Sequence, residues 1–175
     1  MDITSDLKAV FSGDIDSTDK TRETYSHDAS LFELKPKVVV YPKDTKDIQN
    51  LVKWVVEHKD DIPELSITAR SAGTDMSGGA INDSIIADMT RHFTDIREVS
   101  ASSAHLQPGV FFRDFDAKTI EHDSLLPSYP ASRELCTLGG MVSNNSGGEK
   151  SLEYGKTANF VTELSVVFAD GNEYT

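Results

Sequence analysis

The sequence has a single cysteine, and no hydrophobic run approaches the ~18 residues that a membrane-spanning helix needs. One cysteine excludes an intrachain disulfide and favours a reducing compartment. The chain opens with MDITSD, which is acidic and lacks the basic segment and the apolar run of a secretory signal peptide. These absences predict a cytoplasmic protein without a transmembrane segment.

Basic residues are also scarce. The chain has 17 Lys and Arg residues against 29 Asp and Glu residues, which gives a net charge of −12. This balance argues against a broad nucleic-acid-binding face and against binding to an anionic membrane surface, because both need a positive field. A small anionic ligand can still bind through local N–H and hydroxyl donors. The length of 175 residues and the 38% hydrophobic content fit one globular domain.

Residues 1–35 are polar and mixed, and they are predicted to form an N-terminal arm lying on a domain that comprises residues 36–175. Residues 36–42 begin that domain with a β-branched strand closed by proline. Asp44 or Thr45 is a suitable N-cap for a helix, and a further strand is expected at residues 65–70. The apolar stripe of the helix consists of Ile48, Leu51, Val52 and Val55, with Trp54 near its edge.

The stretch at residues 70–79, RSAGTDMSGG, combines three glycines with small and hydroxyl-bearing residues. It lies between the strand at residues 65–70 and a second strand expected at residues 84–89. Successive N–H groups in such a loop can form a concave anion site, to which Thr74 and Ser77 add hydroxyl donors. A pyrophosphate suits that chemistry. The alternative interpretation is a plain Gly-rich hairpin loop.

The next part of the chain predicts a second group of elements. Strands are expected at residues 94–99 and 104–110, and a helix at residues 111–120. Residues 125–130 must be irregular, because two prolines lie close together there. The apolar positions of the helix are Phe112, Phe115 and Ile120.

A second stretch rich in glycine and hydroxyl groups follows at residues 137–148, TLGGMVSNNSGG. Residues 139–146 within it are predicted as a short helix whose N-terminal N–H groups favour an anion. Residues 163–169 have the strongest strand pattern in the chain, and Asp170-Gly171 predicts a hairpin turn. Little sequence follows that turn, so we expect the chain to be a fragment of a longer protein. An exposed edge at Leu164–Ala169 then favours weak self-association.

Common nucleotide-binding and catalytic motifs do not match. A Rossmann fingerprint requires a helix directly after its glycines, whereas a strand is expected after residues 70–79. Gly155-Lys156-Thr157 resembles the end of a Walker A loop, but Lys150 stands where the first glycine is needed. Neither Ser77 nor Ser146 has the preceding glycine of a Gly-x-Ser-x-Gly elbow. The histidines have no metal-ligand spacing, and no carboxylate pair stands out for acid–base chemistry.

Several short motifs occur in a characteristic order: Val38–Pro42, Arg70–Gly79, Gln107–Val110, Leu126-Pro127, Cys136–Gly140, Asn145–Gly148, Tyr154-Gly155 and Val166–Gly171. This order resembles the FAD-binding domain of the vanillyl-alcohol oxidase/p-cresol methylhydroxylase (PCMH) type, and within it the glycolate oxidase subunit and D-lactate dehydrogenase branch. The likeness covers residues 36–175. It implies an α+β fold, a PCMH-type FAD-binding fold of two subdomains that hold FAD between them. The cap domain that follows in the family, which supplies most of the substrate pocket, is absent here.

The resemblance also implies which residues bind the cofactor. One loop wraps the FAD pyrophosphate. The other subdomain contacts the pyrophosphate and the ribityl chain along a further stretch of residues, and it offers backbone groups to the adenine. The first loop consists of Ser71, Ala72, Gly73, Thr74, Asp75, Met76, Ser77 and Gly78; the second set consists of Thr137, Gly139, Gly140 and Ser143, then Asn145 and Gly147, and finally Val161.

The sequence departs from the family pattern in the first loop. Ser71 and Ala72 occupy positions where glycine is usual, and the added methyl group of Ala72 is expected to reduce affinity for FAD. Thr74 stands where relatives with covalently attached FAD have a histidine, which excludes attachment there. Cys136 lies close to where some relatives attach flavin through sulfur. The surrounding sequence, Cys136–Gly140, resembles the branch with non-covalent FAD, and Cys136 itself is expected to be a small buried residue.

We therefore expect the FAD-binding portion of a flavin-dependent oxidoreductase that oxidises a 2-hydroxy acid such as glycolate or D-lactate. No catalytic residue is nominated, because the family places substrate-binding groups in the cap domain. The first alternative is an FAD-dependent oxidoreductase acting on another alcohol, a sugar or a lipid. The second is a non-catalytic nucleotide-binding or interaction module on the same fold.

Overall fold

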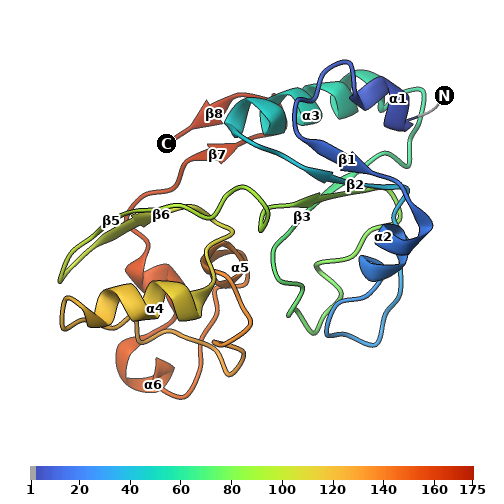
Figure 1. Cartoon of the computed structure of the whole chain (residues 1–175). Coiled ribbons are helices and arrows are strands. Elements are labelled where there is room, and N and C mark those ends of the chain that lie inside the picture. The colour runs from blue at the N-terminus through green and yellow to red at the C-terminus, as the bar shows by residue number, and fades with distance from the viewer. Residues whose placement is uncertain (1–2) are drawn as a thin grey trace. The chain divides into compact units, whose positions relative to one another are not determined.

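The computed structural model describes residues 3–175, which divide into two compact units. The first unit consists of residues 3–92 together with Glu163–Thr175, and the second of Phe93–Thr162 (Figure 1). Both units mix helices and strands, so the α+β prediction is confirmed. Each unit contains one of the two Gly-rich stretches.

The first unit is built on a four-stranded sheet with the order β1-β2-β4-β3. Strands β2, β3 and β4 are parallel, and β1 pairs antiparallel with β2 at the edge. All residues of β2 and β4 are buried, as expected for inner strands covered on both faces. The strands are Asp14–Asp16 (β1), Val38–Tyr41 (β2), Ile67–Arg70 (β3) and Ile85–Asp88 (β4). The three parallel strands confirm the predictions with shorter bounds, whereas β1 was not predicted.

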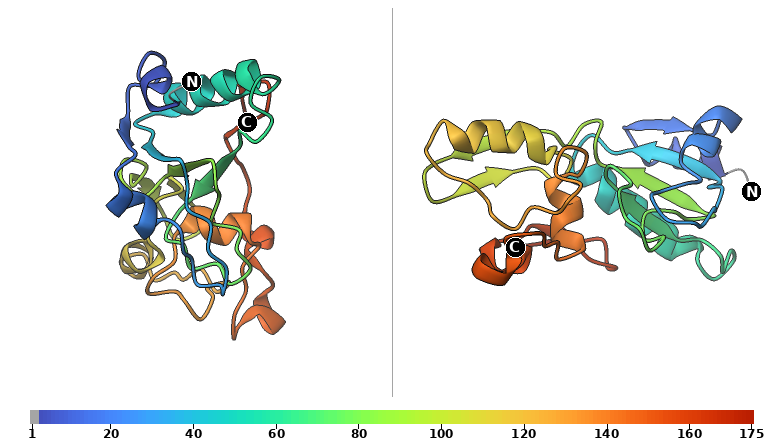
Figure 2. Two further views of the ribbon diagram at one scale, coloured as in Figure 1. Left: turned by 90° about the vertical axis from the view of Figure 1, so that its right-hand side faces the viewer. Right: turned by 90° about the horizontal axis from the view of Figure 1, so that it is seen from below.

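Helix α3, Thr45–His58, connects β2 to β3 and runs along one side of the sheet (Figures 1 and 2). Asp44 is its N-cap, because its carboxylate accepts a 2.9 Å hydrogen bond from the N–H of Asp47. Leu51 and Val55 of the predicted apolar stripe are buried, and Ile48 and Val52 are partly buried, so the stripe is confirmed. Trp54 is also buried and belongs to the core.

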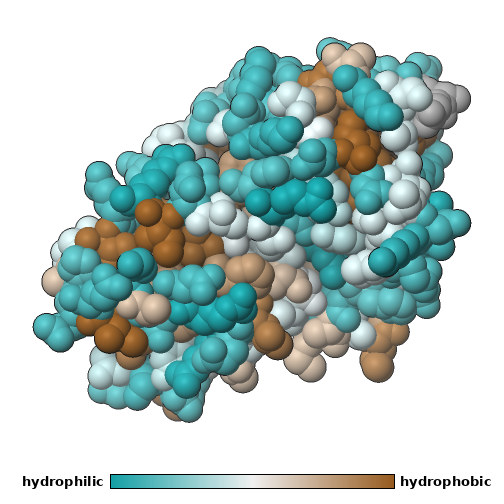
Figure 3. Space-filling model, in the orientation of Figure 1, coloured by the Kyte–Doolittle hydropathy of each residue, from teal (hydrophilic) through white to brown (hydrophobic). Residues whose placement is uncertain are grey.

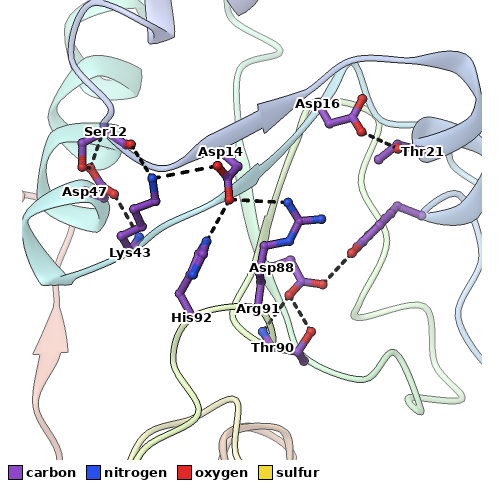
Figure 4. Close-up of polar contacts among 11 residues, drawn as sticks. Ser12, Asp14, Asp16, Thr21, Lys43, Asp47, Asp88, Thr90, Arg91 and His92 are labelled. Carbon is purple, nitrogen blue, oxygen red and sulfur yellow. Dashed lines mark hydrogen bonds and ion pairs between the residues drawn. The ribbon is translucent and has the colours of Figure 1, made fainter.

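The segment before residue 36 is more than a covering arm, because Asp14–Asp16 joins the sheet as β1. Two short helices flank this strand, α1 at Ile3–Leu7 and α2 at Asp19–Thr24. In Figure 4 the Asp14 carboxylate faces three basic side chains. His92 donates to it at 2.9 Å, and the nitrogens of Arg91 and Lys43 lie 3.5 and 3.9 Å away.

The C-terminal residues of the first unit form a small hairpin beside α3. The strand expected at residues 163–169 is reduced to Val166–Val167 (β7), which pairs antiparallel with Glu173–Tyr174 (β8). The predicted turn at Asp170-Gly171 is confirmed, and Gly171 has a φ of +71°. The backbone carbonyl of Gly171 accepts a 3.2 Å hydrogen bond from Gln49 of α3.

The second unit packs one helix and one hairpin around its own apolar core. Strands β5 (Ile96–Val99) and β6 (Ala104–Leu106) are antiparallel, and helix α4 spans Phe112–Ile120. Phe112 and Phe115 are buried as predicted, whereas Ile120 is 62% exposed. The core cluster consists of Val110, Phe112, Phe115, Tyr129, Cys136, Leu138 and Met141.

The rest of the second unit is made of short elements joined by irregular chain. The helix predicted at residues 139–146 is α5, Leu138–Ser143. A single helical turn, α6, follows at Ser151–Tyr154, and a 3-10 turn, η1, at Thr157–Phe160. Residues 125–130 contain no helix or strand, as their prolines require.

The face shown in Figure 3 is mainly hydrophilic, with apolar side chains gathered in a few small groups. None of the helices within residues 3–175 has both the length and the apolar character needed to cross a membrane.

Candidate functional site

The first Gly-rich stretch connects two strands that run in the same direction. It leaves the carboxyl end of β3 at Arg70 and returns to β4, which is parallel to β3. A two-strand hairpin requires antiparallel strands, so the hairpin interpretation of this loop is wrong. In open sheets that contain parallel strands, ligands bind at the carboxyl ends of the strands, which is where this loop begins.

Two glycines give the loop its path. Gly73 and Gly78 have φ angles of +68° and +84°, a region that residues with a Cβ rarely adopt. A Cβ on Gly73 would lie 2.4 Å from the guanidinium of Arg70, and one on Gly78 would lie 2.9 Å from the ring of Phe32. Both positions therefore require glycine for conformation, and at Gly73 the buried Arg70 side chain also leaves no space for a Cβ.

Arg70 is the main polar anchor beneath this loop. Its side chain is buried, and its guanidinium donates to the backbone carbonyls of Tyr25, His27 and Ala80 at 3.4, 2.8 and 3.1 Å. The guanidinium also lies 5.1 Å from the centre of the Tyr25 ring. Desolvation lowers the pKa of Arg70 from its ordinary value, but an arginine stays charged at neutral pH. This buried charge fixes the start of the loop to the N-terminal segment.

Asp75 fixes the second half of the loop. Its Oδ2 atom accepts hydrogen bonds from the N–H and the hydroxyl of Ser77, at 3.1 and 2.8 Å, and from the N–H of Gly79 at 2.7 Å. The backbone carbonyl of Asp75 accepts the N–H of Ala29 at 3.1 Å. The Ser77 hydroxyl, which the sequence predicted as a donor to an anion, donates to Asp75 instead.

Donors remain in the first half of the loop. Within residues 3–175, the backbone N–H groups of Ala72, Gly73 and Thr74 have no hydrogen-bond acceptor. All three residues are only partly buried. Consecutive unpaired N–H groups beside a left-handed glycine provide the chemistry of an anion site. Met76, by contrast, is 81% exposed, so its side chain contributes apolar surface rather than a polar contact.

The second Gly-rich stretch lies in the other unit and begins with a capped helix. The hydroxyl of Thr137 accepts the N–H of Gly140 at 3.2 Å and thereby caps α5. Thr137 is buried, so this structural role accounts for its hydroxyl. A Cβ on Gly139 would lie 2.5 Å from Pro108, which explains the glycine by close packing.

The remaining predicted residues of this stretch follow the helix. Asn145 has a left-handed φ of +44°, and its side-chain oxygen accepts the N–H of Ala158 at 2.9 Å. Gly147 leaves no room for a Cβ, which would lie 2.5 Å from the hydroxyl of Ser151. Ser143 is exposed and Val161 is partly exposed, so both are accessible to a ligand.

A shallow cavity in the second unit lies outside the residues that sequence reasoning selected. It has a volume of about 270 Å³. The hydroxyl of Tyr129 donates to Glu149 at 2.9 Å beside it, and the guanidinium of Arg133 lies 5.0 Å from the ring of Tyr129. Pro127 and Pro130 predicted that this segment is irregular, but nothing in the sequence pattern predicted a cavity beside it. Its lining consists of Tyr129, Pro130, Ala131, Arg133, Gly148 and Glu149.

The structure also brings together three possible metal ligands that have no regular spacing in the sequence. Ligand atoms of Glu23, His27 and Glu33 all lie within 4.8 Å of one another, and all three residues are exposed. Each of the three residues already takes part in an ion-pair contact with a basic or acidic side chain. Glu23 lies 3.4 Å from the ammonium of Lys35, and Glu33 lies 3.7 Å from the imidazole of His27. Surface ion pairs account for this cluster.

Residues 36–175 match a protein family described as FAD binding domain. The chain belongs to this family. The match starts and ends where the resemblance of the short motifs starts and ends, so that expectation is confirmed. Both Gly-rich stretches lie inside the matched residues.

Relatives of the FAD binding domain have similar sequences over most of this chain. D-2-hydroxyglutarate dehydrogenase of Haemophilus influenzae is 31% identical over 98% of the chain, which spans 17% of that protein. Glycolate oxidase subunit GlcD of Bacillus subtilis is 31% identical over 90% of the chain, which spans 33% of that protein. D-lactate dehydrogenase of Archaeoglobus fulgidus is 32% identical over 77% of the chain and 29% of its own length. The chain thus covers a third or less of these relatives.

Solved structures show the same fold. Alkyldihydroxyacetonephosphate synthase has a TM-score of 0.81 and 21% identity over 98% of this chain and 34% of its own. Chitooligosaccharide oxidase has a TM-score of 0.80 and 16% identity over 99% of this chain and 36% of its own. The fold prediction is therefore confirmed. At these identities the likeness concerns the fold alone.

The residues present fit the cofactor of the family. FAD carries a pyrophosphate, and the donors of Ala72, Gly73 and Thr74 are unpaired backbone N–H groups of the kind that bind phosphate oxygens. The left-handed residue of the turn is Gly73, and Ala72 does not have a positive φ. The family and the loop chemistry agree.

Proposed function

We propose that the chain binds FAD non-covalently and that residues 71–78 hold its pyrophosphate. The observation that carries this proposal is the run of unpaired N–H groups at Ala72, Gly73 and Thr74 beside the buried charge of Arg70. A phosphate oxygen accepts such N–H donors, and a buried guanidinium nearby favours a negative charge. The proposed set in this loop is Ser71, Ala72, Gly73, Thr74, Asp75, Met76, Ser77 and Gly78.

In the second unit, we assign the residues around α5 to the same cofactor. Ser143 and Val161 are accessible, while Thr137, Gly139 and Gly147 hold the backbone in place through a cap and through close packing. Gly140 and Asn145 complete the predicted set. When FAD is bound, its flavin ring supplies the electron-accepting chemistry, and the residues of this chain bind and orient it.

The proposal of non-covalent binding is supported by the two positions where attachment occurs in related sequences. Thr74 has no nucleophile suited to flavin attachment. The thiol of Cys136 is 4% exposed, and burial raises its pKa from the ordinary value, so the reactive thiolate is scarce.

For the longer protein we propose an oxidoreductase that acts on a 2-hydroxy acid. The support comes from the relatives, which include dehydrogenases of D-2-hydroxyglutarate and D-lactate and a glycolate oxidase subunit.

The test uses the purified chain mixed with FAD, separated from free flavin by gel filtration and then precipitated with acid. We expect a retained flavin absorption band and yellow colour in the supernatant after precipitation. Colour in the pellet would overturn the non-covalent assignment and indicate Cys136. A chain that is folded by circular dichroism but retains no flavin would overturn FAD binding by this chain and favour the non-catalytic module.

A further inference from the structure

We propose that Asp75 is a positioning residue that divides the donors of the first loop, so that a phosphate group is bound by the N–H groups of residues 72–74 and not by Ser77. This inference rests on the proposed binding of FAD. It differs from the expectation that all residues from Ser71 to Gly78 wrap the pyrophosphate directly.

The geometry of the Asp75 carboxylate carries the argument. A single atom, Oδ2, accepts three hydrogen bonds, from the N–H and hydroxyl of Ser77 and from the N–H of Gly79. Hydrogen bonds to a charged acceptor are about twice as strong as neutral ones. Asp75 therefore closes residues 75–79 into a turn and accepts the N–H groups of Ser77 and Gly79.

The backbone on both sides of this turn is also held. The carbonyl of Asp75 accepts the N–H of Ala29, and the carboxylate of Asp28 accepts the N–H of Ala80 at 3.4 Å. The second half of the loop thus has protein acceptors for its N–H groups at Ser77, Gly79 and Ala80. The first half has none at residues 72–74, as described above. The three consecutive N–H groups without a protein acceptor, at residues 72–74, therefore lie before Asp75.

The negative charge of Asp75 has a second effect. A carboxylate in the same loop repels a pyrophosphate, and this repulsion weakens binding without changing the shape of the loop. Because all three hydrogen bonds go to one oxygen, an asparagine side chain can accept all of them through its single carbonyl oxygen. Asp75→Asn therefore separates the positioning role from the charge.

The experiment compares the FAD dissociation constants of three variants with that of the unchanged chain, measured by quenching of flavin fluorescence. Asp75→Ala should weaken binding about tenfold, because residues 75–79 lose their acceptor. Asp75→Asn should restore binding to at least the original affinity, and the difference between Asn and Asp should shrink at high salt. Ser77→Ala should change the affinity by less than about twofold, because its hydroxyl faces Asp75.

Amide hydrogen exchange of the chain without FAD provides a readout that does not depend on the proposed function. The Gly79 N–H should lose protection in Asp75→Ala and keep it in Asp75→Asn. A Ser77→Ala variant that weakens FAD binding as much as Asp75→Ala would overturn the inference, as would unchanged exchange at Gly79 in Asp75→Ala. If the exchange pattern is as expected but no variant binds FAD, the proposed function fails and the positioning role stands.

Discussion

The guanidinium of Arg70 donates a 2.8 Å hydrogen bond to the backbone carbonyl of His27, a residue 43 positions earlier in the chain. Two further carbonyls, of Tyr25 and Ala80, accept from the same side chain. Arg70 thereby joins the end of β3, the Gly-rich loop and the N-terminal segment. Segments that are remote in the sequence depend on one buried charge for their position.

Replacing Arg70 by lysine tests this dependence. A lysine ammonium is a compact charge and cannot reproduce the planar arrangement of guanidinium donors, so at least one buried carbonyl loses its partner. We expect Arg70→Lys to lower the free energy of unfolding by about 1–3 kcal/mol in urea titrations. The exposed Arg97 is the matched control, and Arg97→Lys should leave stability nearly unchanged. Equal effects of the two variants would contradict the anchoring role.

The left-handed conformation of Gly73 leads to a prediction about ligand binding. Gly73→Ala places a methyl group in a strained backbone conformation and against Arg70, and it should cost about 1–2 kcal/mol of stability. Gly171→Ala is the matched control, because Gly171 has a similar φ of +71° but lies in the β7–β8 hairpin. Both variants should melt at lower temperature, and only Gly73→Ala should lose FAD binding. Retention of FAD by Gly73→Ala would remove this residue from the proposed site.

The elements that were predicted well from sequence have strong local signals. Helix α3 has both an N-cap at Asp44 and an apolar stripe, so its position followed from residues close together in the chain. The Gly-rich loop was found for the same reason. The high glycine content of residues 70–79 indicated the loop, and the positive φ angles of Gly73 and Gly78 explain why glycine is needed there.

The features that were missed depend on partners distant in the sequence. Strand β1 is short, and only its pairing with β2 makes it a strand. Residues 163–169 have high strand propensity, yet within residues 3–175 they pair only through Val166-Val167 with β8, because propensity does not supply a neighbour. The hydrogen bonds of Asp75 join a side chain to nearby N–H groups and have no periodic pattern that a sequence could display.

The carboxylate of Asp14 predicts a pH dependence of stability. The hydrogen bond from His92 is the largest cause that lowers its pKa below the ordinary 3.8, and Lys43 and Arg91 act in the same direction. A carboxyl group with a lowered pKa in the folded state stabilises the protein above its unfolded pKa and loses that effect as the pH falls through the folded pKa. Asp14→Asn should therefore be less stable than the unchanged chain at neutral pH. The difference should shrink as the pH falls below the ordinary pKa of 3.8 and through the lower pKa of the folded state, and a constant difference over the whole range would contradict it.

The edge around β7 predicts weak self-association of the chain. Leu164 and Phe168 are 48% and 58% exposed on either side of Val166–Val167. Exposed apolar side chains next to a short edge strand favour pairing between copies. Sedimentation over a wide concentration range should show a reversible increase in mass that Phe168→Lys reduces. The control is Val56→Lys, since Val56 is 56% exposed on α3 and should not affect the increase. A strictly monomeric profile would count against the prediction.

The environment of Cys136 predicts how its thiol reacts. It is buried in the core cluster of the second unit with Phe112 and Leu138, and burial raises its pKa. Thiolate is the reactive form, so a thiol reagent at neutral pH should label the folded chain slowly and the urea-unfolded chain at the rate of a free cysteine. Cys136→Ser should remove all labelling and should leave the retention of FAD unchanged, because a non-covalent cofactor needs no sulfur. Rapid labelling of the folded chain would show that the thiol is accessible. Loss of FAD from a folded Cys136→Ser variant would return Cys136 to the cofactor site.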